Sequence, residues 1–312
     1  MASHVFGVDV GGTTIKLGLF DSNGNVIDKW EIPTRTEDGG KNILADIADA
    51  VHAKMAEKGL TKEDIAGVGV GVPGPVDGKG IVHKAVNLGW GMFNLKEELQ
   101  KLLDGMHVEG GNDANVAALG EMWKGGGQGH KNLVAVTLGT GVGGGIICNG
   151  QMVTGANGAG GEIGHIHVED NETEECGCHN IGCLEQYASA TGIARLARKR
   201  LEEDTEDSVL RGREISAKSV FDAVKFGDKV AIQIAERFGE YLGKGLAAIA
   251  GVVNPEIFVI GGGVSKAGEV LFEYIKPYYM QYAFRGCRDA EFALATLGND
   301  AGIFGAAKLI LA

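Results

Sequence analysis

One pattern of strands and glycine turns, met twice along the chain, restricts the fold more than any other feature. In its first copy, residues 5–10 and 15–20 read as strands joined by a turn with two adjacent glycines. An Asn-Gly pair at 23–24 then turns the chain into a third strand over residues 26–32, because this pair suits a tight hairpin. The chain therefore opens as an antiparallel meander.

A second meander has the same order of elements. It begins with an apolar strand over 133–138, followed by a glycine-rich turn at 139–145 and another Asn-Gly pair at 149–150. Two later segments also match, because strands 68–72 and 257–260 each run into a glycine-rich loop. Glycine turns between strands are common, so chance likeness is the alternative. We predict an α/β fold with two lobes of the same duplicated topology, facing each other.

The length of 312 residues is enough for two lobes, each with its own core. We expect a smaller lobe of residues 1–111 and 302–312, and a larger lobe of residues 112–301 with an insert at about 160–187. The chain has 52 glycines but only 5 prolines, so the glycines serve backbone geometry and not low-complexity sequence.

Charge and hydropathy restrict the partners. The net charge of −12 repels nucleic acid and anionic lipid. No apolar run reaches the roughly 20 residues that cross a bilayer, and the first residues do not have the pattern of a secretory signal. We therefore expect a cytoplasmic protein that binds small molecules, and neither a membrane nor nucleic acid.

The first glycine turn has the composition of an anion site. Asp9 ends the first strand, Gly11 and Gly12 form the turn, and Thr13 and Lys16 follow it. Glycine lets a ligand approach the backbone, and successive N–H groups in a turn attract an anion. The pattern is neither the dinucleotide fingerprint nor a Walker loop, because a strand follows it. An ordinary hairpin is the alternative reading.

Asp113 stands where the smaller lobe passes into the larger one, directly before an apolar helical segment. One interpretation is a helix cap, in which the carboxylate accepts backbone N–H bonds at the helix start. The other is a general base that accepts the proton of an attacking hydroxyl. The two roles are compatible.

A histidine and three cysteines indicate a metal. His165, Cys176, Cys178 and Cys183 are typical zinc ligands, and glycines between them allow a tight knuckle. Four protein ligands fill a tetrahedral site, so we expect a structural zinc ion. Free buried thiols are the alternative, and His167 and His179 compete with His165 for the imidazole position.

At this point the sequence resembles the ROK family of repressors, open-reading-frame proteins and sugar kinases, and within it the bacterial, Bacillus-type, ATP-dependent glucokinases. The resemblance extends from residue 5 to about residue 307. The motifs that carry it are Asp9-x-Gly-Gly-Thr-x-x-Lys16, Gly71-x-Pro-Gly-Pro75, Asn112-Asp-Ala-Asn115, Leu138-Gly-Thr-Gly-Val-Gly-Gly-Gly145, Gly161-Glu-x-Gly-His165 and Cys176-x-Cys178-x4-Cys183-x-Glu185. The glycine motifs are weak singly, whereas the ordered His/Cys set is highly specific. The family implies an actin/hexokinase-like, ribonuclease H-like fold.

The resemblance also implies a phosphotransferase that moves phosphate from ATP, with Mg²⁺, to an alcohol group of a hexose, first of all glucose. Asp113 matches the general base of the family. The matched sugar-binding positions, besides Asp113, are Asn112, Glu162, His165, Glu185 and Gly74. The matched ATP-binding positions are Asp9, Gly11, Gly12, Thr13, Lys16, Gly139, Thr140, Gly141, Gly143, Gly261, Gly262 and Gly263. Dimers are common among similar proteins, so we expect a homodimer.

Two positions depart from the family pattern, and several functions stay open. His179 stands where the family usually has Gly, and Gly111 stands where it often has Glu. The sugar could instead be N-acetylmannosamine, N-acetylglucosamine, fructose or allose, because pocket shape decides the substrate. A sugar-sensing repressor is the alternative from another class. The first strand is predicted to begin by about His4, so we expect no DNA-reading segment before it, and the net charge is unfavourable for binding DNA.

Overall fold

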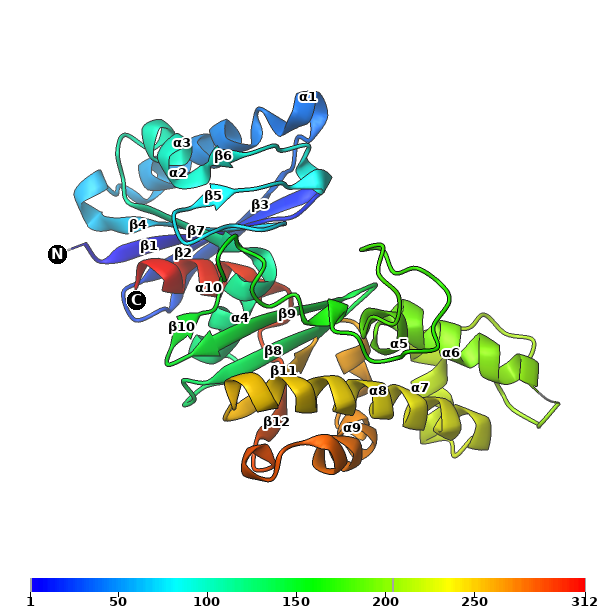
Figure 1. Ribbon diagram of the computed structural model, residues 1–312. Coiled ribbons are helices and arrows are strands. Elements are labelled where there is room, and N and C mark those ends of the chain that lie inside the picture. The colour runs from blue at the N-terminus through cyan, green and yellow to red at the C-terminus, as the bar shows by residue number, and fades with distance from the viewer. Residues whose placement is uncertain (1, 204, 312) are drawn as a thin grey trace. The chain divides into compact units, whose positions relative to one another are not determined.

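The computed structural model describes residues 2–203 and 205–311. The chain divides into two compact units. Unit 1 comprises Met1–Gly129, Gly145–Gly161 and Leu297–Ala312, and unit 2 comprises His130–Gly144 and Glu162–Thr296. Figure 1 follows the chain through both by colour. The boundary between the two lobes after residue 111 remains a prediction from the sequence.

The first sheet is the predicted meander extended by two parallel strands. Its order is β3 (Val26–Pro33), β2 (Thr14–Asp21), β1 (His4–Val10), β4 (Ile65–Val72) and β7 (Val108–Asn112). β1 pairs with β2 antiparallel and with β4 parallel. The alternating apolar residues of these strands enter one buried core, as half-buried strands require.

The second sheet repeats this topology. Its order is β10 (Gln151–Met152), β9 (Val142–Cys148), β8 (Leu133–Leu138), β11 (Ile257–Gly261) and β12 (Glu291–Leu294). Each strand has a counterpart at the same place in the first sheet, and β11 is parallel to β8 as β4 is to β1. The predicted duplication is therefore confirmed. The copies differ at the third strand, which has eight residues in β3 and two in β10.

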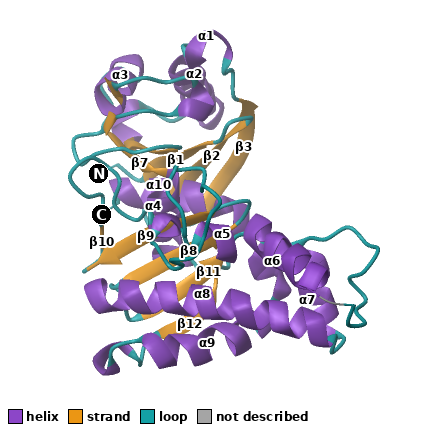
Figure 2. Cartoon of the chain, turned by 45° about the vertical axis from the view of Figure 1, so that its right-hand side comes forward, coloured by secondary structure: helices purple, strands orange, loops and turns teal. Residues whose placement is uncertain are grey.

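Helices accompany the sheets in both units (Figure 2). Those of unit 1 are α1 (Glu37–Gly40), α2 (Ile43–Lys58), α3 (Leu95–Leu102), α4 (Asp113–Lys124) and α10 (Ala301–Ile310). Those of unit 2 are α5 (Glu185–Ala188), α6 (Ala190–Glu203), α7 (Ala217–Lys225), α8 (Lys229–Val253) and α9 (Val270–Tyr282). Of these, α6 and α7 pack against α8. The short strands β5 (Ile81–Val82) and β6 (Phe93–Asn94) form a separate pair.

Helix α2 shows how the local sequence sets these elements. Its apolar residues recur every three or four positions, and Ile43, Ile47 and Val51 are fully buried in the core of the first sheet. Gly59 ends the helix with a left-handed backbone, φ 65°, which glycine adopts without strain. Within the described residues, no helix is both long and apolar enough to cross a lipid bilayer.

Candidate functional site

The first glycine turn is open on one side and anchored on the other. The N–H of Gly11 donates to the carbonyl of Thr14 at 3.0 Å, and the hydroxyl of Thr34 donates to the carbonyl of Gly11 at 2.7 Å. A Cβ on Gly12 would meet no atom within 4 Å, so the backbone there faces open space. A fixed turn with an accessible backbone is what an anion site needs.

Asp9 lies at the base of this turn, paired in register with Lys16 across the β1–β2 ladder. Burial and, next, the nearby Asp113 raise the pKa of its carboxyl, Lys16 lowers it, and the net pKa is about 6. Helix α10 packs against it at Gly302, where a Cβ would come within 2.6 Å of a carboxylate oxygen. A side chain at position 302 would therefore displace Asp9.

Asn112 and Asp113 form one hydrogen-bonded group at the start of α4. The side-chain oxygen of Asn112 accepts the N–H groups of Ala114 and Asn115 at 3.0 and 3.1 Å, so Asn112, and not Asp113, is the N-cap. The reason is backbone geometry, because Asn112 has the extended conformation of a cap. Asp113 is the first helical residue, and its Oδ1 accepts the N–H of Ala114 at 2.8 Å.

The amide of Asn112 connects two predicted sugar-binding positions. Its Nδ2 donates to Oδ1 of Asp113 at 3.0 Å and to the carbonyl of Gly74 at 3.1 Å. Gly74 has φ 95°, and a Cβ there would lie 2.3 Å from the carbonyl of Lys84. The structure thus brings Gly74, Asn112 and Asp113 together, with the Asp113 carboxylate held by donors.

In unit 2, the second glycine turn is joined to a predicted sugar-binding carboxylate. The N–H of Gly139 donates to the carbonyl of Gly141 at 3.0 Å, which closes the turn around Thr140. Oε2 of Glu185 accepts the N–H of Val142 at 2.9 Å, and a Cβ on Gly141 would lie 2.1 Å from that oxygen. Glycine at 141 is therefore required for Glu185 to dock. Gly143 follows in β9.

The last glycine segment lies beside the end of β8. Gly261 ends β11, and Gly262 has φ 83°. A Cβ on Gly262 would lie 2.5 Å from the carbonyl of Leu138, whereas Gly263 has open space around it. Because Leu138 directly precedes Gly139, the two predicted ATP-binding segments of unit 2 come together at one edge of the sheet.

The four predicted metal ligands converge. The ligand atoms of His165, Cys176, Cys178 and Cys183 all lie within 4.8 Å of one another. The Sγ atoms of Cys178 and Cys183 are 3.6 Å apart, and Sγ of Cys176 is 3.7 Å from Nδ1 of His165. Zinc–sulfur bonds of about 2.3 Å in a tetrahedron place sulfurs about 3.8 Å apart, so these spacings fit one zinc ion.

The competing histidines point to other partners. His167 contacts the carbonyl of Ile181 at 3.0 Å and Asp170 at 2.8 Å, and these contacts raise its pKa. His179 has φ 68° and lies 3.6 Å from Glu175. Glu162 is exposed and directly precedes the short turn that ends at His165.

A model of the ROK family matches residues 5–312. This chain belongs to the ROK family. A glucokinase of Halalkalibacterium halodurans is 46% identical over 310 residues, which are 97% of this chain and 94% of that protein. The predicted family is thereby confirmed.

Two solved structures resemble this ROK protein over nearly its whole length. A ROK hexokinase of Thermus thermophilus has a TM-score of 0.81 and 31% identity, covering 99% of this chain and 97% of that one. A ROK glucokinase of Streptomyces griseus, in complex with glucose and AMPPNP, has a TM-score of 0.72 and 34% identity, covering 98% of both chains. The predicted hexokinase-like fold is confirmed by these likenesses.

Sequence reasoning missed two buried acids of this ROK protein. Glu121 in α4 is 4% exposed and accepts the N–H groups of Gly126 and Leu297 at 2.8 and 3.0 Å. Its position among the apolar residues of α4 is the signal that could have found it. Glu172 lies in an acidic segment of the insert, and nothing in its local sequence separates it from its exposed neighbours.

Proposed function

We propose that this ROK protein is a glucokinase, which transfers the γ-phosphoryl group of ATP to the C6 hydroxyl of D-glucose. The observation that carries the proposal is the Asp113 carboxylate, held by the Asn112 amide and by a backbone N–H at the start of α4. The likeness to proteins named glucokinase supports glucose as the sugar.

In the proposed reaction, Asp113 is the general base. The C6 oxygen forms a bond to the γ-phosphorus while the bond from that phosphorus to the bridging oxygen of ADP breaks. The hydroxyl proton passes to a carboxylate oxygen of Asp113 as the new bond forms. Asn112 keeps the carboxylate in place by donating to Oδ1, and a fixed base needs no reorientation in the transition state.

The sugar positions are proposed from the matched motifs. The positions matched to sugar binding are, besides Asp113, Asn112, Gly74, Glu162, His165 and Glu185. Carboxylate, amide and imidazole groups suit sugar hydroxyls, because they accept or donate hydrogen bonds in fixed directions. The docking of Glu185 on the N–H of Val142 supports its role, since it holds one oxygen in place.

The nucleotide positions follow the glycine turns. Gly11, Gly12, Thr13 and Lys16, and the turn at 139–143, would bind phosphate oxygens of ATP. The segment 261–263 would bind its adenosine. Asp9 fits a Mg²⁺ ion, because burial and the acid Asp113 raise the pKa of its carboxyl more than Lys16 lowers it, so a further cation would stabilise the ionised form. Mg²⁺ bound with ATP supplies charge neutralisation at the phosphates.

We infer a structural zinc ion at His165, Cys176, Cys178 and Cys183. The spacing of the ligand atoms supports it, and the four protein ligands leave no position for a reactive water. Burial and the neighbouring thiols raise the pKa of Cys183, so zinc binding there would displace the thiol proton. Elemental analysis should find one zinc per chain, and a metal-free, fully active protein would refute this role.

We further propose a cytoplasmic homodimer. None of the five cysteines, all of which lie in the described residues, forms a disulfide, which suits a reducing compartment. Sedimentation equilibrium should give twice the mass of one chain. A monomer at micromolar concentration would refute the dimer.

The experiment that decides the function is a panel of sugars in an assay coupled to ADP release. We expect glucose to give the highest kcat/KM. Fructose, allose, N-acetylmannosamine and N-acetylglucosamine should each be lower by 10-fold or more, because groups misplaced in a polar site leave hydrogen bonds unmade. A higher kcat/KM for any of these four sugars would make that sugar the substrate. If neither glucose nor any of the four causes ADP release, the proposed kinase activity is refuted.

A further inference from the structure

The loop between His165 and Cys176 is held in place by a buried carboxylate that the proposed phosphoryl transfer does not use. We propose that Glu172 is a positioning residue for the zinc cluster, because it fixes the loop whose two ends are the ligands His165 and Cys176. The inference rests on the zinc site proposed above.

Burial singles out Glu172 within this loop. Between Val168 and Cys176 it is the one buried residue, and its side chain is 4% exposed. Every other side chain over residues 169–175 is exposed or half-buried. A loop of this kind has little apolar packing of its own, so its position depends on its polar contacts.

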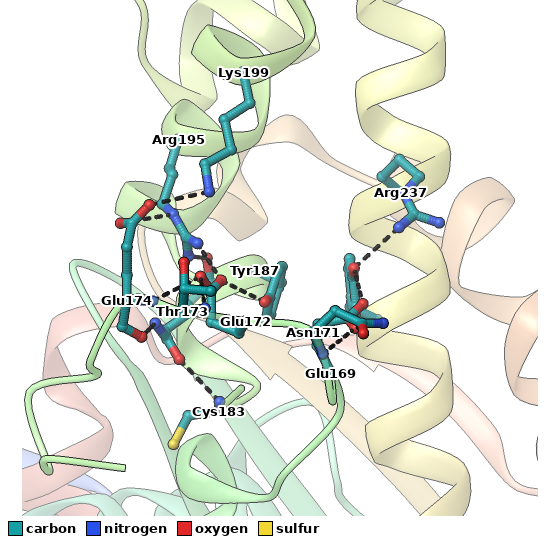
Figure 3. Close-up of polar contacts among 12 residues, drawn as sticks. Glu169, Asn171, Glu172, Thr173, Glu174, Cys183, Tyr187, Arg195, Lys199 and Arg237 are labelled. Carbon is teal, nitrogen blue, oxygen red and sulfur yellow. Dashed lines mark hydrogen bonds and ion pairs between the residues drawn. The ribbon is translucent and has the colours of Figure 1, made fainter. Parts of the chain in front are cut away.

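Both oxygens of Glu172 are occupied. Oε2 accepts the hydroxyl of Tyr187 at 2.5 Å and the guanidinium of Arg195. Oε1 accepts the N–H groups of Thr173 and Glu174 at 2.9 and 3.1 Å. Figure 3 shows Glu172 among these donors, with the Arg195 side chain approaching from its helix. Burial alone would raise the pKa of Glu172, but the hydrogen bonds from Arg195 and Tyr187 outweigh it and hold the pKa at about 2.

These donors connect the loop to helices next to the cluster. Tyr187 lies in α5, whose first residue, Glu185, places Oε1 3.6 Å from Sγ of Cys176. Between them, Gln186 donates to the carbonyl of Glu174 at 2.8 Å and accepts the N–H of Cys183 at 3.0 Å. Glu172 is thus joined through Tyr187 to α5. The first two residues of that helix contact two of the four ligands, Cys176 and Cys183.

A cavity behind the loop explains why these contacts matter. It has a volume of about 810 Å³, and Glu169, Glu172 and Thr173 line it together with residues of α6 and α8. Across it, the hydroxyl of Tyr241 donates to Glu169 at 2.8 Å, and the Tyr187 and Tyr241 rings stack at 3.9 Å. With a cavity and not packed core behind it, the loop can shift when a polar anchor is lost.

The test is the zinc affinity of the purified protein, measured by competition with a chromophoric chelator. Glu172→Gln keeps the shape of the side chain but removes the charge that Arg195 faces. We expect its zinc affinity to fall about 10- to 100-fold, the usual effect of losing a residue that orients metal ligands. Glu172→Asp keeps the charge and should recover part of this loss.

Glu175→Gln is the matched control. Glu175 belongs to the same loop, directly precedes Cys176 and is 70% exposed. It loses the same charge closer to the metal, so general electrostatics would weaken zinc binding at least as much as in Glu172→Gln. We expect a change of less than about threefold, since exposed charges interact weakly. An equal loss in both variants would overturn the positioning role.

Tyr187→Phe covers the case in which Glu172→Gln does not fold. It removes one hydrogen bond and keeps the Glu172–Arg195 pair, so zinc affinity should fall about 2- to 10-fold. Wild-type affinity in both variants, or in Tyr187→Phe alone if Glu172→Gln does not fold, would overturn the inference. A wild-type protein that binds no zinc would instead refute the zinc site itself, and the two failures are distinguishable.

Discussion

Asp9 in unit 1 is half-buried and Glu172 in unit 2 is buried, and the groups around the two carboxylates shift their pKa values in opposite directions. Asp9 has another acid, Asp113, close enough to raise its pKa, and burial brings that pKa to about 6. Glu172 has a guanidinium, a hydroxyl and two backbone N–H groups, and its pKa is about 2. A raised pKa indicates a carboxylate that a bound cation or a proton would stabilise, which is typical of a functional site. A carboxylate whose two oxygens both accept hydrogen bonds has a structural role.

The largest effect on activity should come from substitution of Asp113, the acid that raises the pKa of Asp9. Asp113→Asn removes the proposed base but keeps the side-chain shape, so kcat should fall about 10²- to 10⁴-fold. Calorimetry should show that glucose still binds. Asp104→Asn, at a carboxylate that is 81% exposed, is the control and should leave kcat unchanged. An unaltered kcat in Asp113→Asn would refute the base.

Glu172→Gln should give the next effect, on stability. At pH 7 the free energy of unfolding of the metal-free protein should fall by about 2–4 kcal/mol, because Arg195 loses its buried partner. The folded pKa lies below the ordinary 4.5, so the stabilisation is present above pH 4.5 and is lost as the pH falls toward 2. The difference from wild type should therefore shrink over that range. A constant difference would contradict the charged pair.

Asp9→Asn should raise the free energy of unfolding, whereas Glu172→Gln lowers it. The folded pKa of about 6 lies above the ordinary 3.8, so the ionised carboxylate disfavours folding above pH 6 and this cost vanishes below 3.8. The ligand-free variant should be more stable than wild type by about 1–3 kcal/mol at pH 8, with no difference near pH 3.8. A destabilised variant at pH 8 would remove the contrast between the two acids.

Intrinsic chromophores separate the two units in these experiments. All three tryptophans, Trp30, Trp90 and Trp123, lie in unit 1, and all six tyrosines lie in unit 2. Tryptophan fluorescence should therefore report the Asp9→Asn effect, and the near-ultraviolet circular dichroism of tyrosine the Glu172→Gln effect.

The smallest effect tests whether Glu172 differs from its neighbour Glu169. Tyr241→Phe removes the hydroxyl that donates to Glu169, which is only half-buried. The free energy of unfolding should fall by about 1 kcal/mol, the usual value for one hydrogen bond. A loss as large as that of Glu172→Gln would show that both acids hold the loop equally.

Much of the fold could be predicted because its signals are local. The glycine turns, the Asn-Gly hairpins and the apolar segments predicted the two meanders and the strands β4 and β11, but not β7 and β12. The four-residue apolar spacing predicted α2. The short β10 was not expected, since an Asn-Gly pair specifies a turn and not the length of the strand after it. A cap at or near Asp113 was one of two interpretations of that residue. Asn112 and Asp113 are both good caps, and only the backbone conformation shows that Asn112 is the N-cap.

The family, the duplicated topology and the four residues of the proposed zinc site could be predicted from the amino-acid sequence alone, because each depends on residue types at short, fixed spacings. Three features became visible only in the folded chain: Gly302 packs on Asp9, Glu185 accepts the N–H of Val142, and Glu172 is buried among its exposed acidic neighbours. The physical reason is distance along the chain. These contacts join residues tens to hundreds of positions apart, or depend on a helix packed from elsewhere, and no local pattern carries that information.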